Sequence, residues 1–180
     1  RYFAPEGEVD LCGHATIAAF TVLRDTGAIA PGDYALHTRS GDLEIGVGED
    51  AVWMDMAAPK DGRTFSEEEQ KALYAAYGLT LADRPAGLEP QAVSTGLMDI
   101  LLPVQTLETL DRAVQNEAEV TRLSEHYDVV GVHMFCPNTP DAAAHCRNFA
   151  PLYAIPEEAA TGTSTGALTW YLYRRGLIQA

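Results

Sequence analysis

The residues best placed for chemistry occur at two points of the chain that resemble each other. Gly13 and His14 begin one apolar segment, and Gly162 and Thr163 begin another. The N–H groups at the start of a helix bind anions, and glycine lets a ligand approach the backbone closely. An imidazole can donate or accept a proton near neutral pH. The pattern predicts a site that binds a small carboxylate and moves protons on it.

Acidic and hydroxyl side chains surround the second of these points. Glu157 and Glu158 precede it, and a carboxylate there either stabilises the helix dipole or acts as a general acid or base. Residues 161–165 read Thr-Gly-Thr-Ser-Thr, which offers N–H and hydroxyl donors to a carboxylate or forms a plain helix cap. Because no lysine follows, the loop is not of the type that binds nucleotide phosphates.

These two points belong to a longer internal repeat. Residues 1–5 read Arg-Tyr-Phe-Ala-Pro, and residues 147–151 read Arg-Asn-Phe-Ala-Pro. Each is followed by an apolar segment bounded by glycines, and the two segments, 13–27 and 162–176, have the same length. We therefore expect two related lobes whose helix starts face one cleft. Two ordinary core helices are the simpler alternative.

The elements that position these residues follow from their patterns. Both apolar segments lack a polar face, which is typical of helices enclosed by protein, and a basic last turn followed by glycine predicts their ends. Ser66 and Glu69 form a capping box that predicts a helix to about residue 77. Alternating or β-prone runs predict strands at 34–38, 43–47, 51–56, 98–104, 129–135 and 145–150.

The middle of the chain predicts a lobe boundary and a longer helix. Residues 57–62 read as a linker, so we expect a first lobe at 1–60 and a second lobe at 61–180. Residues 107–126 predict one amphipathic helix with its apolar side inward. The inward side chains would be Leu107, Leu110, Val114, Val120 and Leu123. The fold class is α+β, with mostly antiparallel sheets around one central helix in each lobe.

Composition excludes several classes of partner. The chain has 180 residues, 47% of them hydrophobic, and a net charge of −14, which disfavours nucleic acid and anionic membranes as partners. Its three cysteines show no disulfide spacing, which fits a reducing cytoplasm. No run is long enough for a membrane span, and no signal peptide is visible. A first residue of Arg rather than Met indicates part of a longer protein.

The cysteines have two further interpretations. Cys12 precedes a helix start, where a thiol can act as a base, but the matching position of the repeat is Thr161. The chain therefore lacks the second thiol that a symmetric mechanism with two thiol bases requires. The simpler interpretation of Cys12 is that it is a small buried residue. The spacing of Cys136, His145 and Cys146 fits no standard zinc pattern, so we expect no metal.

Two longer motifs contain the candidate residues. Residues 3–16 read Phe-Ala-Pro-x-x-Glu-x-x-Leu-Cys-Gly-His-Ala-Thr, and residues 149–151 and 155–163 read Phe-Ala-Pro and Ile-Pro-Glu-Glu-Ala-Ala-Thr-Gly-Thr. The first motif resembles the first signature of the PhzF-like family of phenazine biosynthesis, and the second motif resembles the second signature of that family. Residues 93–104 look like the segment that opens the family's second lobe. The similarity spans almost the whole chain.

The resemblance implies a fold and an activity. The fold would be that of diaminopimelate epimerase, with two pseudo-symmetric lobes, each a β-sheet or barrel around a central helix, and the active site between them. The first lobe would be incomplete here. The activity would be isomerisation of a small amino or hydroxy acid by proton transfer, without a cofactor. Pairing into homodimers is a further expectation from the family.

The resemblance also implies roles for particular residues. The family's histidine maps to His14, its aspartate to Glu158, which is one methylene longer, and its serine to Thr163, which keeps the hydroxyl. Gly13 and Gly162 would bind the substrate together with His14 and Thr163. The family's glutamate has no counterpart among these residues, so we expect the chain alone to be inactive. Two alternatives stay open: a racemase or dehydratase of proline type that uses Cys12 as its base, and a metabolite-binding protein without catalysis.

Overall fold

The computed structural model describes two compact units. The described residues are 1–4, 7–9, 11–39, 41–137, 139–159 and 161–179. The first unit is Arg1–Ala57 and the second is Ala58–Ala180. None of the helices in these ranges has the length and apolar character needed to cross a membrane.

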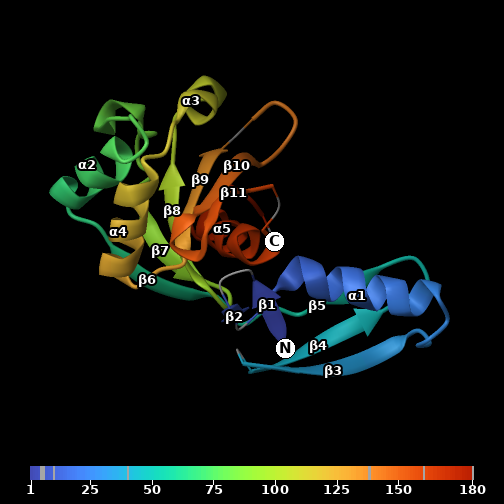
Figure 1. Cartoon of the computed structure of the whole chain (residues 1–180). Helices are drawn as coiled ribbons and strands as arrows, with labels where there is room; N and C mark the ends of the chain where they lie inside the picture. The colour runs from blue at the N-terminus through green and yellow to red at the C-terminus, as the bar shows by residue number, and fades with distance from the viewer. Residues whose placement is uncertain (5–6, 10, 40, 138, 160, 180) are drawn as a thin grey trace. The chain divides into compact units, whose positions relative to one another are not determined.

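The first unit combines a hairpin, a helix and a three-stranded sheet (Figure 1). Its elements in chain order are β1 (Tyr2–Ala4), β2 (Gly7–Val9), α1 (Gly13–Asp25), β3 (Gly32–Thr38), β4 (Gly41–Val47) and β5 (Val52–Met54). The strands β3, β4 and β5 pair antiparallel, as their alternating patterns predict. Ile45 and Val47 on β4 are buried in this sheet.

The helix α1 is less enclosed than its sequence predicts. It packs against β4 and β5, and Thr16 is its buried residue. The side chains of Val22 and Leu23 are 59% and 39% exposed. The prediction of an enclosed helix is therefore wrong for α1 within the described residues, because a sheet on one side of a helix leaves its other side uncovered.

The second unit is built on a six-stranded sheet in the order β11-β10-β9-β8-β7-β6. Its strands are β6 (Lys60–Thr64), β7 (Gln91–Ser94), β8 (Met98–Pro103), β9 (Gly131–Pro137), β10 (Ala144–Ala150) and β11 (Ile155–Glu158). Neighbours pair antiparallel except β8 and β9, which are parallel. Parallel neighbours require a crossover, and the helices between β8 and β9 supply it. As far as the described strands show, the sheet stays open rather than closing into a barrel.

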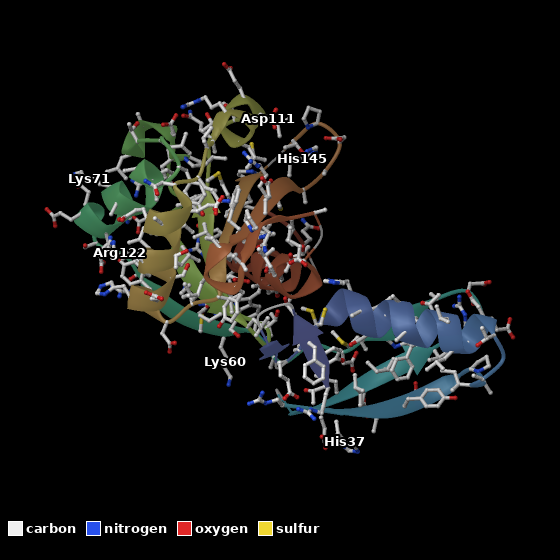
Figure 2. All side chains as sticks on the ribbon, in the orientation of Figure 1. His37, Lys60, Lys71, Asp111, Arg122 and His145 are labelled. Carbon is white, nitrogen blue, oxygen red and sulfur yellow. The ribbon has the colours of Figure 1, made fainter. Side chains whose placement is uncertain are left out.

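Two hydrophobic clusters cover the two faces of this sheet. One includes side chains of α2 (Glu67–Ala75), α3 (Leu107–Arg112) and α4 (Glu117–Tyr127). The other includes α5 (Gly162–Arg174), whose buried residues include Ala167, Leu168, Tyr171 and Leu172. The prediction that protein encloses this helix is therefore confirmed for the face of α5 that carries these residues. Figure 2 shows Lys71, Asp111 and Arg122 projecting outward from α2, α3 and α4, as expected of amphipathic helices.

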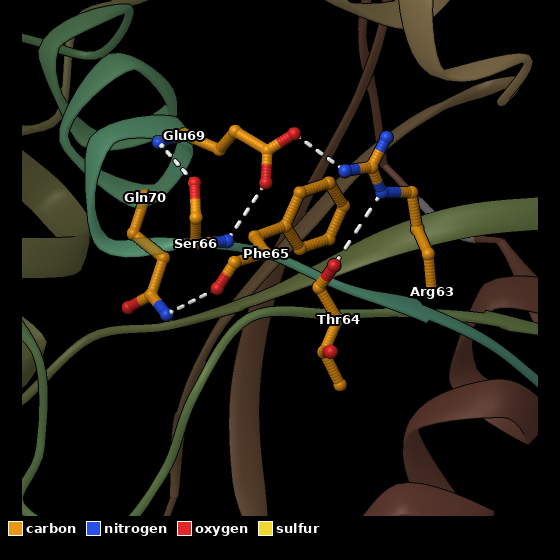
Figure 3. A network of polar contacts seen from close by, with 6 residues as sticks. All are labelled: Arg63, Thr64, Phe65, Ser66, Glu69 and Gln70. Carbon is orange, nitrogen blue, oxygen red and sulfur yellow. Dashed lines mark hydrogen bonds and ion pairs between the residues drawn. The ribbon is translucent and has the colours of Figure 1, made fainter.

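The start of α2 confirms the predicted capping box (Figure 3). The backbone N–H of Glu69 donates to the Ser66 hydroxyl at 3.3 Å, and the N–H of Ser66 donates to the Glu69 carboxylate at 2.7 Å. Arg63 also binds Glu69 and lies over the rings of Phe65 and Tyr127. The linker predicted at 57–62 is wrong for residues 60–62, because these residues belong to β6.

The helix predicted at 107–126 is two helices, α3 and α4, and this corrects the sequence analysis. Leu110, Val120 and Leu123 are buried as predicted, but Val114 is 75% exposed. Residues 113–116 leave the helical path because their N–H groups find other partners. Val114 donates to the carbonyl of Tyr77, and Asn116 donates to that of Ala76.

New caps at both ends of the break replace the lost helical bonds. At the end of α3, the guanidinium of Arg147 donates hydrogen bonds to the carbonyls of Leu110 and Ala113. The side chain of Asn116 accepts from the N–H of Glu119 and so caps α4.

Candidate active site

The two helix starts have the same local geometry. The residue before α1, Cys12, has φ −142° and ψ 98°, and the residue before α5, Thr161, has φ −130° and ψ 99°. Neither side chain forms a capping hydrogen bond. Since the first N–H groups of a helix have no partner within the helix, each start presents donors that its own cap residue does not use.

The rest of each helix repeats as well. Thr16 donates its N–H and hydroxyl to the carbonyl of Cys12 at 3.1 and 2.9 Å. Thr165 does the same to Thr161 at 3.0 and 2.8 Å. Both helices have 13 residues and both are followed by a glycine with positive φ, 70° in one copy and 68° in the other. The duplication read from the sequence is therefore also a duplication of backbone structure.

The hairpins that lead into these helices share an arginine–glutamate pair. Arg1 donates to both carboxylate oxygens of Glu8 at 2.9 and 2.8 Å, and Arg147 donates to both of Glu157 at 2.8 Å. Each guanidinium also lies 5.0 Å from the ring centre of the phenylalanine two residues later. This pairing joins each strand to its hairpin partner, and it was not among the contacts predicted from the sequence.

The repeat separates the roles of the two adjacent glutamates. Glu157 matches Glu8, and its hydrogen bonds to Arg147 lower the pKa of its carboxyl. Glu158 is half-buried and accepts a hydrogen bond from the Thr161 hydroxyl at 2.7 Å. Glu157 is therefore a structural residue, and Glu158 is the carboxylate beside the start of α5.

The first turn of α5 holds the other candidates of the second unit. Gly162 is exposed, and a Cβ added to it would meet no atom within 4 Å. Thr163 is buried, and its carbonyl accepts from the hydroxyl of Thr95 at 2.8 Å. The structure thus brings Glu158, Gly162 and Thr163 together around one helix start.

The first unit holds the remaining candidates around the start of α1. His14 is exposed, and its Nε2 lies 3.5 Å from the Sγ of Cys12. A Cβ on Gly13 would lie 3.4 Å from the Cε of Met54. Gly13, His14 and Cys12 are therefore neighbours within this unit. That the two helix starts share one cleft stays a prediction.

A buried carboxyl group beside α5 was missed by the sequence analysis. Asp99 on β8 is 2% exposed and accepts a hydrogen bond from the hydroxyl of Ser164 at 2.5 Å. Burial raises its pKa to about 6, the nearby charge of Glu158 adds to the rise, and hydrogen bonds from Ser164 and the N–H of Gly131 oppose it. The signal in the sequence was a single acid inside the apolar run 97–104.

A buried histidine was missed in the same way. His133 on β9 is 2% exposed, and its Nδ1 lies 3.0 Å from Oδ1 of Asn148 on β10. Its Nε2 has no hydrogen-bond partner in the part of the chain that the structure describes. Burial lowers its pKa, so the ring is neutral at physiological pH. Asn148 pairs with both His133 and Glu158 across the sheet, which places the three on one face.

We predict that Asp99 makes the protein less stable as the pH rises from 4 to 7. The folded chain keeps the proton of this carboxyl up to about pH 6, whereas the unfolded chain releases it near its ordinary value of 3.8. The difference corresponds to about 3 kcal/mol of unfolding free energy. Urea denaturation of wild type and Asp99→Asn at several pH values measures it. The stability gap between the two proteins should change across this range, and a constant gap would contradict the prediction.

Metal ligands do not cluster in the described residues. They contain no group of three or more His, Cys, Asp or Glu side chains that could hold a metal ion. Cys136 and His145 pair across β9 and β10, and the Nε2 of His145 lies 2.9 Å from Oδ1 of Asp141.

Comparison with known proteins points to one family. The family model described as phenazine biosynthesis-like protein, PhzC-PhzF, matches residues 1–180. An uncharacterized isomerase of Deinococcus radiodurans is 36% identical over 185 residues, which are 98% of this chain and 58% of the relative. A crystal structure of a PhzF-family phenazine biosynthesis protein from Bacillus anthracis has a TM-score of 0.82 and 29% identity, and the match covers 96% of this chain and 60% of that one.

A more distant structure shares the fold alone. A hydroxyproline epimerase from Agrobacterium vitis, with bound trans-4-hydroxy-L-proline, has a TM-score of 0.56 and 15% identity over 98% of this chain and 55% of that one. These matches confirm the epimerase-like α+β fold expected from the sequence. The chain spans about three fifths of the length of the curated relatives it matches.

Proposed function

This chain belongs to the phenazine biosynthesis-like family, and we propose that the full-length protein is an isomerase that moves a proton between carbon atoms of a small amino or hydroxy acid. It would need no cofactor, because a base takes the proton from one carbon and an acid returns one to another, and no electrons are lost or gained. The observation that carries the proposal is the pair of matched helix starts, each without a side-chain cap, with His14 beside one and Glu158 beside the other.

The proposed roles follow from this arrangement. The N–H groups near Gly13, His14, Gly162 and Thr163 would bind the substrate carboxylate between the two lobes. His14 and Glu158 would assist proton transfer, and the hydroxyl of Thr163 would offer a further donor. The chain spans about three fifths of the length of the curated relatives it matches, so the proposal concerns the full-length protein.

Isotope exchange tests the proposal directly. The full-length protein is incubated in deuterium oxide with a panel of cyclic and acyclic amino and hydroxy acids, and mass spectrometry detects deuterium at carbon. We expect exchange into at least one substrate. Tight binding of carboxylates without any exchange would contradict catalysis and favour a metabolite-binding protein.

A second candidate function rests on the thiol beside His14. The 3.5 Å contact between the Sγ of Cys12 and the Nε2 of His14 would let the imidazole take the thiol proton and leave a thiolate base. A racemase or dehydratase of proline type would use such a base. Labelling with iodoacetamide distinguishes the two functions. Loss of exchange, with substrate protecting Cys12 from the label, favours the thiol mechanism, whereas an active Cys12→Ser variant excludes it.

We predict that Gly162→Ala leaves the protein folded but weakens substrate binding. A Cβ there has open space, and alanine in a helix is favoured over glycine by about 0.5–1 kcal/mol, so stability should hold or rise. The new methyl group would displace the substrate carboxylate from the first-turn N–H groups. Loss of one charge-assisted hydrogen bond should raise KM by about tenfold or more.

The control for this variant lies on the same helix. Thr169→Ala changes an exposed residue of α5 whose hydroxyl donates to the carbonyl of Thr165. Its KM should equal that of wild type. An unchanged KM in Gly162→Ala would show that the carboxylate binds elsewhere.

A further inference from the structure

Asp99 is a buried acid that the proposed reaction does not use. It lies on β8 among buried hydrophobic neighbours, Ile100, Leu101 and Leu102. Its carboxylate faces the start of α5, where the Ser164 hydroxyl donates to it at 2.5 Å. Burying a charged carboxylate that has no cationic partner is unfavourable, so the position of Asp99 needs a physical explanation.

The hydrogen bond between Ser164 and Asp99 is not needed to form the helix start. In the repeat, Thr165 matches Thr16, and Ser164 therefore matches Ala15, which has no hydroxyl to donate. The start of α1 nevertheless has nearly the same cap dihedrals and the same threonine bonds as α5. The fold builds this helix start without a serine in the first turn, so the link from Ser164 to Asp99 is specific to the second copy.

The hydrogen bond from Ser164 to Asp99 is one of three that tie the start of α5 to other segments of the second unit; each of the three is called a tie below. The Thr161 hydroxyl binds Glu158 on β11, the Thr163 carbonyl binds the Thr95 hydroxyl after β7, and Ser164 binds Asp99 on β8. Three residues at this helix start are therefore held by β11, by β8 and by the residue that follows β7. Removing one tie leaves the turn able to move relative to Glu158.

We propose that Asp99 is a positioning residue, which holds the first turn of α5 through Ser164 so that Thr163 and Glu158 keep their places in the site. The proposal rests on the proposed function in that this turn is taken to bind the substrate carboxylate. A misplacement of about 1 Å at such a site can lower the rate by about a hundredfold, so a tie of this kind has a measurable effect.

Hydrogen exchange tests the tie without any assay of activity. In the full-length protein, the N–H groups of residues 165–168 bond to carbonyls of the first turn, and their exchange is followed by mass spectrometry. We expect exchange about tenfold faster in Asp99→Ala and in Ser164→Ala, and an intermediate rate in Asp99→Asn, which keeps an acceptor for Ser164. Should Asp99→Ala fail to fold, Ser164→Ala and Asp99→Asn carry the test.

Tyr74→Phe is the matched control. Its hydroxyl donates to the carbonyl of Pro103 at 2.5 Å, so this variant also removes a buried hydrogen bond to β8, but from a side chain of the other hydrophobic cluster. Exchange at 165–168 should remain as in wild type. Equal acceleration in Tyr74→Phe would mean that the effect is general destabilisation, and this would overturn the proposal.

Two functional measurements complete the test. Substrate turnover in Asp99→Ala and Ser164→Ala should fall about tenfold in kcat with a smaller change in KM, and the double variant should be no worse than either single variant. Additive losses would overturn the proposal. If wild type shows no turnover, the proposed function fails, and acetate binding at the amide resonances of Gly162 and Thr163 replaces kcat as the readout. Affinity for acetate that is the same in wild type and Ser164→Ala would then overturn the positioning role.

Discussion

Glu158→Gln is expected to remove most of the proton exchange and to leave the protein folded. Glutamine has the same shape as glutamate, and its amide oxygen can still accept the hydrogen bond that the Thr161 hydroxyl gives to Glu158 at 2.7 Å. It cannot take or give up a proton at that position. General acid–base catalysis typically contributes about 10²–10⁴ in rate, so we expect kcat for deuterium exchange to fall by at least about a hundredfold.

The neighbouring glutamate provides a stringent control for this experiment. Glu157→Gln changes the same type of side chain one position earlier, but it weakens the pair with Arg147 rather than the proposed site. This pair is partly exposed, so its loss should cost little stability. Exchange should continue near the wild-type rate. Equal losses in the two variants would show that strand β11, and not the Glu158 carboxylate, is what the reaction needs.

Local patterns in the sequence were sufficient to identify the repeat. The Phe-Ala-Pro motifs and the glycine spacing are short-range signals, and the structure repeats them as matched helices with matched ends. The capping box at Ser66 was equally readable because its two partners lie three residues apart. Candidate residues at the helix starts, Gly13 and Gly162 among them, followed from the same local reasoning.

Contacts between distant segments could not be read in this way. Asp99 and Ser164 are separated by 65 positions, and Thr95 and Thr163 by 68, so only the folded sheet shows that they meet. The pairing of Arg147 with Glu157 depends on the register of a hairpin.

The break between α3 and α4 also has a long-range cause. Its backbone groups bond to Ala76, Tyr77 and Arg147, which are all distant in sequence. The amphipathic pattern of the sequence continues through residues 113–116, although their contacts with distant segments keep these residues out of the helix.

Gly131→Ala is expected to cause a large loss of stability. A Cβ on Gly131 would lie 2.0 Å from the carbonyl oxygen of Phe149 and 3.1 Å from the Cα of Ala150. Both are backbone atoms of β10, so no side-chain rotation relieves the contact and the strand itself must move. Phe149 is 1% exposed and packs on Tyr77, with ring centres 5.0 Å apart, so such a movement also disturbs the core.

The expected size and its control follow from the same geometry. Overpacking in a core typically costs about 1–3 kcal/mol, and a clash with backbone belongs at or above the upper end of that range. Urea denaturation should show a lower midpoint with an unchanged slope. Gly162→Ala is the matched control, because its Cβ meets nothing within 4 Å. A shared midpoint for the two variants would show that β10 moves away from β9 at little cost, and this would contradict the prediction. Since β10 pairs with β11 and its Asn148 lies opposite Glu158, a displaced β10 should also move Glu158, so that Gly131→Ala slows exchange even in the fraction that stays folded.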